Sequence, residues 1–311
     1  MRRAGLPGGA RVPAAILLAV LAARMAPARG AGARLVPAAP SRVDVVGSDT
    51  ALPLAVRWAE DFHRRRPDVR ISVTGGGSAV GLACLAQGLC QVAASSRPAA
   101  PEERARARAA GRPLRAHPAA LDAVAVIVHP SNPVPFLTFP QLRAIYSGRV
   151  TNWRQVGGPD RPVVALSRGA GSGTGQIFEE AVFGPPETRT GPDGLPRARQ
   201  VPGSALLHDD VARTPEAIGY VGVGYVTPAV RAVPVARTPA ESPVPPAVPL
   251  IAGGRYPLVR PILLYTAGAS STAALAFVDY ALGPDGQARV AEAGFVPLAL
   301  RTPARQGGGP G

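Results

Sequence analysis

The residues best suited to chemistry lie in the glycine-rich stretch SRGAGSGTGQIFEE, residues 167–180. This stretch follows a short apolar run at 163–166 and precedes apolar residues at helical spacing, so it joins a predicted strand to a predicted helix. A helix start exposes unpaired backbone N–H groups and carries a partial positive charge. Arg168 adds a full charge in a planar fork, and the hydroxyls of Ser172 and Thr174 add further donors. Together these groups predict a binding site for an oxyanion.

Other glycine motifs do not fit this spacing. A P-loop requires a lysine, and this loop has none. The dinucleotide fingerprint needs a third glycine where the chain has Gln176 or Thr174. A nucleophile elbow needs a glycine two residues before Ser172, where Ala170 stands. For this loop taken alone, a glycine-rich turn without a ligand remains the competing interpretation.

Three earlier loops have the same character. Each follows a predicted strand, is rich in small or hydroxyl-bearing residues, and leads into a helix or a turn. Their sequences are GSDT at 47–50, GGGS at 75–78 and SSRP at 95–98. Strands that alternate with helices indicate an α/β fold, and such folds bind ligands at the carboxyl ends of their strands. Four such loops therefore favour one shared binding site over four unrelated turns.

The remaining segments continue this alternation. We expect strands at 42–46, 70–74, 91–94, 121–129 and 259–266, and helices at 79–86, 99–116, 139–146, 272–282 and 285–293. A long apolar run covers 217–226, and the proline- and glycine-rich segment 237–254 is expected to be irregular.

The N-terminus has the features of a secretory signal. Arg2, Arg3 and Arg11 precede an apolar run at 12–23 that is too short to span a bilayer, and small residues follow as cleavage sites. We expect residues 1–33 to be a signal peptide that is cleaved on export to a periplasmic or other extracytoplasmic location. An uncleaved anchor is the alternative. The tail at 301–311 is expected to be disordered.

Cysteine content and charge give two further expectations. Cys84 and Cys90 predict a disulfide in an exported protein, and two buried thiols are the alternative. The formal net charge is +14 and all 34 basic residues are arginines, a balance that could attract nucleic acid. The arginines are scattered, however, without aromatic interleaving or zinc-ligand spacing, so no nucleic-acid partner is expected.

The titratable residues do not favour an enzyme. The four histidines lie far apart in the sequence, and adjacent carboxylates such as Glu179 and Glu180 do not face each other on a helix. Ser172 could act as a nucleophile beside a base, but the sequence offers none. We therefore expect no catalytic residue, no metal and no cofactor, with a secreted phosphatase-like enzyme as the alternative.

Eight motifs, in order, resemble those of the phosphate-binding proteins of bacterial phosphate ABC transporters, the PstS family. The resemblance covers about residues 41–300. The motifs are GSDTALPLAVRWAEDF (47–62), TGGGSAVG (74–81), AASSRP (93–98), LTFPQLRAIYSGRVTNW (137–153), SRGAGSGTG (167–175), AIGYVGVGY (217–225), YPLVRPILLYT (256–266) and GFVPL (294–298).

The resemblance implies a two-lobed, periplasmic-binding-protein-like α/β fold of type II, with two hinge-crossing strands at about 121–130 and 217–226. One lobe would comprise 41–123 with 227–300, and the other 124–226. Inorganic phosphate would be captured between the lobes and delivered to an ABC permease in the membrane, and the protein would be a monomer. A protein that binds another oxyanion, such as sulfate, is the alternative within this class.

By position, the resemblance also implies the residues that contact phosphate. They come from all four loops and are Ser48, Asp49, Thr50, Ala51 through its backbone, Ser78, Ser96, Arg168, Ser172, Gly173 and Thr174. The chain departs from the best-known members at Ser96, where they hold an aspartate that accepts the proton of hydrogen phosphate. Asp49 could take over that acceptor role, or it could simply cap the helix that begins beside it.

Overall fold

The computed structural model describes residues 41–186, 189 and 197–300. The expected signal peptide and the expected disordered tail therefore lie outside the described residues. Within the described ranges, no helix is both long enough and apolar enough to cross a membrane.

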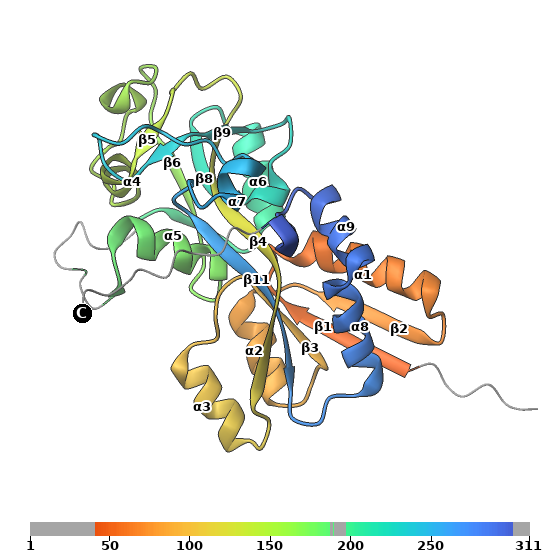
Figure 1. Ribbon diagram of the computed structural model, residues 1–311. Helices are drawn as coiled ribbons and strands as arrows, with labels where there is room; N and C mark the ends of the chain where they lie inside the picture. Colours follow the sequence, from red (N-terminus) through yellow and green to blue (C-terminus); the bar gives the residue numbers. More distant parts are fainter. Residues whose placement is uncertain (1–40, 187–188, 190–196, 301–311) are drawn as a thin grey trace, which may run out of the picture. The chain divides into compact units, whose positions relative to one another are not determined.

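Strands form one large mixed sheet and one small pair (Figure 1). The order in the large sheet is β2-β1-β3-β11-β4-β8-β6-β7, with β9 also paired to β4, while β5 pairs with β10. The strands are β1 (Ser41–Gly47), β2 (Val69–Thr74), β3 (Val92–Ser95), β4 (Leu114–Val128), β5 (Leu137–Thr138), β6 (Val164–Arg168), β7 (Arg199–Val201), β8 (Ala217–Gly222), β9 (Arg231–Val233), β10 (Val235–Ala236) and β11 (Val259–Ala267).

Helices lie on both faces of the large sheet, as the alternating sequence pattern predicts. The α-helices are α1 (Leu52–Arg65), α2 (Ser78–Ala86), α3 (Pro101–Ala109), α4 (Phe139–Tyr146), α5 (Gly173–Phe183), α6 (Ser204–Arg213), α7 (Val248–Ala252), α8 (Thr272–Leu282) and α9 (Pro284–Glu292). Short 3₁₀ helices are η1 (Trp153–Val156), η4 (Val223–Tyr225) and η5 (Leu298–Leu300).

Two separate regions of hydrophobic core define two lobes. In the first lobe, alternate residues of a strand point to opposite faces: Val92 and Ala94 pack toward α1, α8 and α9, while Ala93 packs toward α2. In the second lobe, Val126 packs toward α4 and α5, and its neighbour Ile127 packs toward α6. Each lobe is thus a sheet covered on both faces.

The long strand β4 passes from one lobe to the other. Its first part, up to Ala123, pairs with β11 in the first lobe. Its last part, Val124 to Val128, pairs with β8 and β9 in the second lobe. This arrangement confirms the expected two-lobed α/β fold, and β4 crosses within the predicted range 121–130. The second crossing, predicted at 217–226, lies elsewhere, because β8 pairs with β4 and β6 in the second lobe and the chain returns to the first lobe at β11.

The second lobe extends further along the chain than the sequence suggested. The boundary predicted at 226 assigned β9, β10 and α7 to the first lobe, but β9 pairs with the distal end of β4 and β10 pairs with β5. Ile251 and Tyr256 lie in the core of the second lobe, and the Tyr256 hydroxyl donates to the Val124 carbonyl oxygen at 2.9 Å. We therefore propose lobes of 41–123 with 259–300, and of 124–258.

A second difference concerns the helix predicted at 99–116, which ends at Ala109. The chain turns at Gly111, whose φ of +69° is a conformation that favours glycine, and Pro113 then prevents a return to helix. Strand β4 consequently starts at Leu114, earlier than the apolar pattern indicated.

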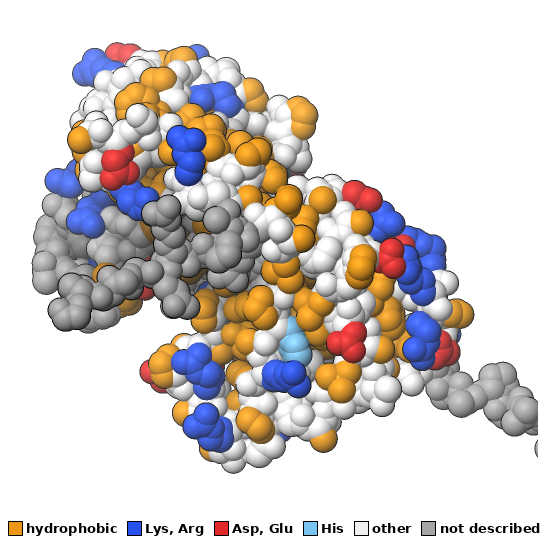
Figure 2. Space-filling model, viewed as in Figure 1, with side chains coloured by type: hydrophobic (Ala, Val, Ile, Leu, Met, Phe, Trp, Pro, Cys, Tyr) orange, Lys and Arg blue, Asp and Glu red, His pale blue; other side chains and the backbone are white. Residues whose placement is uncertain are grey.

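Arginine side chains on the face seen in Figure 2 are dispersed, and several lie beside acidic side chains. Ion pairs of this kind join Arg66 to Asp68 at 2.7 Å and Arg65 to Asp285 at 2.5 Å. Exposed ion pairs contribute little to stability. Their main consequence is that an acidic side chain offsets the charge of the arginine beside it, so these arginines do not add to one large basic patch.

Candidate functional site

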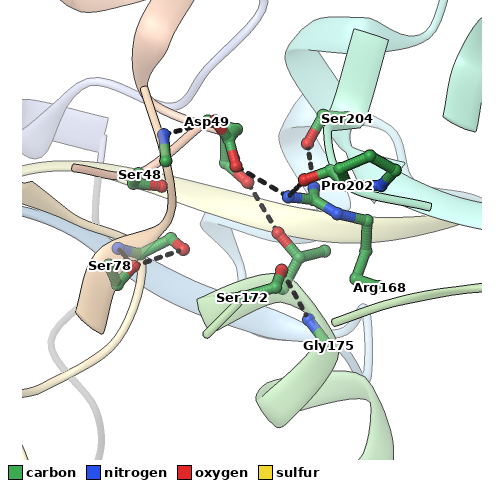
Figure 3. A network of polar contacts seen from close by, with 12 residues as sticks. Ser48, Asp49, Ser78, Arg168, Ser172, Gly175, Pro202 and Ser204 are labelled. Carbon is green, nitrogen blue, oxygen red and sulfur yellow. Dashed lines mark hydrogen bonds and ion pairs between the residues drawn. The ribbon is translucent and has the colours of Figure 1, made fainter. Parts of the chain in front are cut away.

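The four predicted loops meet at the junction of the two lobes. Strands β1, β2 and β3 are parallel, so the loops that follow them lie along one edge of the sheet. The fourth loop follows β6 in the second lobe and leads directly into α5. Residues from all four loops contact one another, and Figure 3 labels residues from the first, second and fourth loops.

Arg168 is the charged centre of this interlobe site. It is the last residue of β6 and only 2% of its surface is exposed. Its Nη2 donates to Asp49 Oδ2 at 2.7 Å and to the Pro202 carbonyl oxygen at 3.2 Å, and its Nη1 donates to Ser204 Oγ at 2.5 Å (Figure 3). Its Nε has no hydrogen-bond partner among the described residues. A buried guanidinium with a free N–H is a strong donor for an oxyanion.

A pair of threonines joins the two lobes directly. Thr50, in the loop after β1, and Thr174, in the first turn of α5, lie with their hydroxyl oxygens 2.6 Å apart. Each is only 1% exposed. One hydroxyl must donate to the other, which leaves the second proton available to a ligand.

The loops after β2 and β3 supply two more buried hydroxyls. Ser78 Oγ accepts from the Ser96 backbone N–H at 3.1 Å and lies 3.3 Å from Ser96 Oγ. Gly173, the first residue of α5, packs against them so closely that a Cβ atom there would lie 2.5 Å from Ser96 Oγ and 2.7 Å from Ser78 Oγ. The start of α5 thus reaches the loops of the first lobe because residue 173 has no side chain.

The remaining predicted residues, apart from Asp49, lie at the starts of helices α5 and α1. Ser172 is the N-cap of α5, and its hydroxyl accepts from the Gly175 N–H at 3.2 Å. Ser48 Oγ lies 3.4 Å from the Ala51 nitrogen at the start of α1. All ten predicted residues therefore come from the junction of the lobes.

Asp49 does not cap α1. The N-cap of that helix is Ala51, whose methyl side chain accepts no hydrogen bond. Instead, Asp49 Oδ1 accepts from the Gly76 N–H at 2.9 Å, and Oδ2 faces Arg168. The carboxylate therefore lies inside the site, next to its principal cation. It can accept further hydrogen bonds because an ionised carboxylate has about four acceptor positions.

Sequence reasoning missed several residues that hold this arrangement together. Ser204 begins α6 and binds Arg168, and Tyr220 on β8 accepts from the Arg168 backbone N–H at 3.1 Å. No local pattern marks either residue. Asp122 and Arg260 form an ion pair that is fully buried behind Thr50. A signal for this pair was present, because Asp122 is the only acidic residue or arginine in the predicted strand 121–129 and Arg260 is the only one in the predicted strand 259–266.

Burial changes the pKa values of two tyrosines around the site. It raises the pKa of Tyr220 to about 12, partly opposed by the hydrogen bond with Ser167. It also raises the pKa of Tyr225 to about 12, and the negative charge of Asp49 adds to that rise. Tyr225 donates its hydroxyl to the Asp49 carbonyl oxygen at 2.7 Å, so it ties the second lobe to the loop after β1. Both tyrosines are neutral at physiological pH.

Cys84 and Cys90 are free thiols in the structure, and the expected disulfide is not formed there. The Cys90 thiol is buried and lies 3.9 Å from the Gly81 carbonyl oxygen. Burial raises the pKa of the Cys90 thiol, and a hydrogen bond with Cys84 raises it further. The disulfide stays a prediction for the exported protein in an oxidising compartment.

The fold and the site together define a class of protein. Two α/β lobes share one long strand, and buried polar side chains from both lobes meet at their junction, as in binding proteins that enclose a small anion between two lobes. A family model described as the PBP superfamily domain matches residues 36–285. It covers most of the chain and includes all four loops.

Individual relatives narrow this class. The phosphate-binding protein PstS of Pseudomonas aeruginosa is 30% identical over 273 residues, which cover 82% of this chain and 83% of that protein. PstS of Bacillus subtilis is 30% identical over 258 residues, or 82% and 80% of the two chains. The chain therefore belongs to the PstS family of phosphate-binding proteins.

Solved structures agree with this assignment. A Clostridium perfringens protein, assigned as a phosphate ABC transporter substrate-binding protein and solved with bound phosphate, has a TM-score of 0.74 and 30% identity. The match covers 83% of this chain and 100% of that one. An ABC-type phosphate transport receptor from Vibrio cholerae has a TM-score of 0.62 and 26% identity, with 82% and 99% coverage.

Proposed function

We propose that this protein captures inorganic phosphate at the interlobe site and delivers it to an ABC permease in the membrane. The observation that carries this proposal is the environment of Arg168. Its guanidinium is buried, its Nε is unpartnered among the described residues, and it bonds Asp49 of the first lobe and the Ser204 hydroxyl of the second. The Thr50–Thr174 pair adds one hydroxyl from each lobe to the same junction. A set of neutral donors around one cation replaces the water shell of an oxyanion at low cost.

Phosphate fits this site better than a fully deprotonated anion does. Near neutral pH phosphate carries at least one proton, whereas sulfate carries none. Asp49 offers an acceptor for that proton within the site, and the same carboxylate would repel sulfate. Sulfate nevertheless remains the second candidate, because Ser96 stands where the best-known relatives hold an aspartate.

Delivery to a permease requires that the protein work outside the cytoplasm. The arginine-led apolar segment within residues 1–33 supports export with removal of a signal peptide. We propose that the exported protein acts as a monomer and is not an enzyme. The relatives named above are binding proteins, and the site offers donors to an anion rather than a nucleophile activated by a base.

Calorimetric titration of the exported protein tests this function. We expect saturable binding of one phosphate per chain and much weaker binding of sulfate. Equal affinity for the two anions would contradict the phosphate assignment, and no binding of either would contradict the anion site. A chromogenic phosphate ester added to the same preparation should release no product above a buffer control, and turnover would favour the phosphatase alternative.

A further inference from the structure

Behind the threonine pair lies an ion pair that is completely enclosed by protein. Asp122 on β4 and Arg260 on β11 are direct neighbours across the two antiparallel strands. Both side chains are 0% exposed, and Arg260 Nη2 and Nε lie 2.7 and 2.8 Å from Asp122 Oδ2. Burial raises the pKa of Asp122 and lowers that of Arg260, while their mutual attraction opposes both shifts. A pair this deeply buried is costly to desolvate, so stability alone is a weak reason for it.

The pair contacts both lobes at the point where the chain crosses between them. Asp122 Oδ1 accepts from the Val223 N–H at 3.0 Å, directly after the end of β8. Gly222 packs so tightly here that a Cβ atom would lie 2.4 Å from Thr50 Cγ2 and 2.9 Å from Asp122 Oδ2. The position of Thr50 is thus bounded by the ion pair on one side and by the strand end on the other.

Arg260 also binds the hydroxyl of Thr50. Its Nη2 donates to Thr50 Oγ1 at 3.1 Å, and because a guanidinium has no acceptor, the hydroxyl must accept this bond. Thr50 Oγ1 also shares a hydrogen bond with Thr174 Oγ1. If Thr174 donates to Thr50, both lone pairs of Thr50 are occupied and its proton is directed outward. If Thr50 donates to Thr174, the proton of Thr174 is directed outward instead.

Both arrangements leave one hydroxyl proton for the ligand, strengthened by the positive charge behind it. We propose that Arg260, held in place by Asp122, is a positioning residue that makes the Thr50–Thr174 pair a hydrogen-bond donor to the bound anion. This inference rests on the proposed function. The inference adds to the proposed function a second arginine that contributes to anion binding, and this arginine acts through Thr50.

A second observation supports this role. Three buried side-chain nitrogen or oxygen atoms in the described residues have no hydrogen-bond partner, and two of them are Arg168 Nε and Arg260 Nη1. An unpaired buried donor is unfavourable unless something satisfies it. Both atoms belong to arginines that bind the loop after β1, so positive charge reaches this loop from two directions.

A thermodynamic cycle on the exported protein tests the inference with phosphate as the probe. One arm replaces both charges, Asp122→Asn with Arg260→Met, which keeps an acceptor for the Val223 N–H and leaves no charge unpaired. The other arm is Thr50→Val, which keeps the shape and removes the hydroxyl. We expect each arm to weaken phosphate binding roughly tenfold, as for loss of a charge-assisted hydrogen bond. We expect the combined variant to be little weaker than either arm, because both remove the same donor.

Two further variants exclude a purely structural effect. Arg260→Lys keeps a partner for Asp122 and should fold even if the double replacement does not, and we expect it also to bind phosphate several-fold more weakly. Asp61→Asn, which breaks an ion-pair cluster near α8 and α9, should lower the melting temperature without changing phosphate affinity.

Any one of three results would overturn the inference. The first is that the effects of the two arms on phosphate binding add fully in the combined variant. The second is that the charge-replaced variant binds phosphate within twofold of the wild type, and the third is that Arg260→Lys binds phosphate with unchanged affinity. Each of these leaves the proposed function intact, because the wild type still binds phosphate. A wild type that binds no phosphate would instead overturn the proposed function, and this inference with it.

Discussion

Arg168 gives the site a buried positive charge. Asp49 contacts one nitrogen of its guanidinium, Nη2, and the Nε N–H remains for a ligand. Replacing Arg168 with alanine removes the charge-assisted bond to the anion and leaves the Asp49 carboxylate without its partner. We expect phosphate binding to weaken by about 2–5 kcal/mol. Calorimetry checks this, with Arg199→Ala as the control, because Arg199 is an exposed arginine on the neighbouring strand β7. Binding by Arg168→Ala within a few-fold of the wild type would remove this residue from the site.

Asp49 is expected to determine selectivity rather than affinity. In Asp49→Asn the group facing Arg168 is neutral, so it neither repels sulfate nor accepts the proton of hydrogen phosphate as strongly. We expect the preference for phosphate over sulfate to fall roughly tenfold, the size of one charge-assisted hydrogen bond. Competitive titration with both anions from pH 5 to 8 measures the ratio. An unchanged ratio would limit Asp49 to holding Arg168 and the loop at Gly76.

For single residues, the sequence predicted the hydroxyl groups and the arginine of the site, but not the residues that hold them in position. Thr50 and Thr174 were both predicted site residues, and the structure places their oxygens in contact. Ser204 was not predicted, because it lies 36 residues beyond Arg168 and starts a different helix. Tyr220 looked like one apolar residue among many in its strand. Such supports depend on packing between elements, which local sequence patterns do not record.

Helix α5 connects the two lobes through its first residue. A methyl group in Gly173→Ala would collide with the hydroxyls of Ser78 and Ser96 and push the start of α5 away from the first lobe. We expect phosphate affinity to fall by about 5- to 150-fold, since overpacking costs about 1–3 kcal/mol. The melting temperature should change little, because each lobe keeps its own core.

Gly171→Ala, in the loop just before α5, is the matched control for Gly173→Ala. A Cβ atom at residue 171 would meet nothing within 4 Å. Calorimetric titration of both variants measures the difference. Equal affinities in the two variants would show that close approach at residue 173 does not matter for binding.

Periodicity predicted most elements because each has a clear apolar pattern and a clear stop. Helices α4 and α8 have the predicted ends, 139–146 and 272–282. The boundary between the lobes could not be predicted in the same way. Strands β9 and β10 are two or three residues long, and their lobe depends on pairing with distant strands rather than on their own sequence.

The acid stability of the whole protein should depend partly on Asp61 in α1. Hydrogen bonds from Tyr280, and also from Arg64 and Arg289, lower the pKa of Asp61 from its ordinary value near 3.8 to about 2. A lowered pKa in the folded state stabilises the fold above pH 4, and that stabilisation is lost as the pH falls from about 4 to 2. Asp61→Asn should lower the melting temperature at pH 6 and reduce its dependence on pH below 4. A parallel pH dependence in the two proteins would show that Asp61 does not contribute.

In the proposed function, loops from both lobes enclose one oxyanion beside Arg168. A crystal structure of the exported protein grown with arsenate tests it most directly, because arsenic scatters anomalously and arsenate has the shape and charge of phosphate. We predict one anomalous peak within hydrogen-bond reach of Arg168 Nε, the Thr50–Thr174 pair and Ser78. A peak elsewhere, or one that contacts the loops of a single lobe, would contradict an anion site between the lobes.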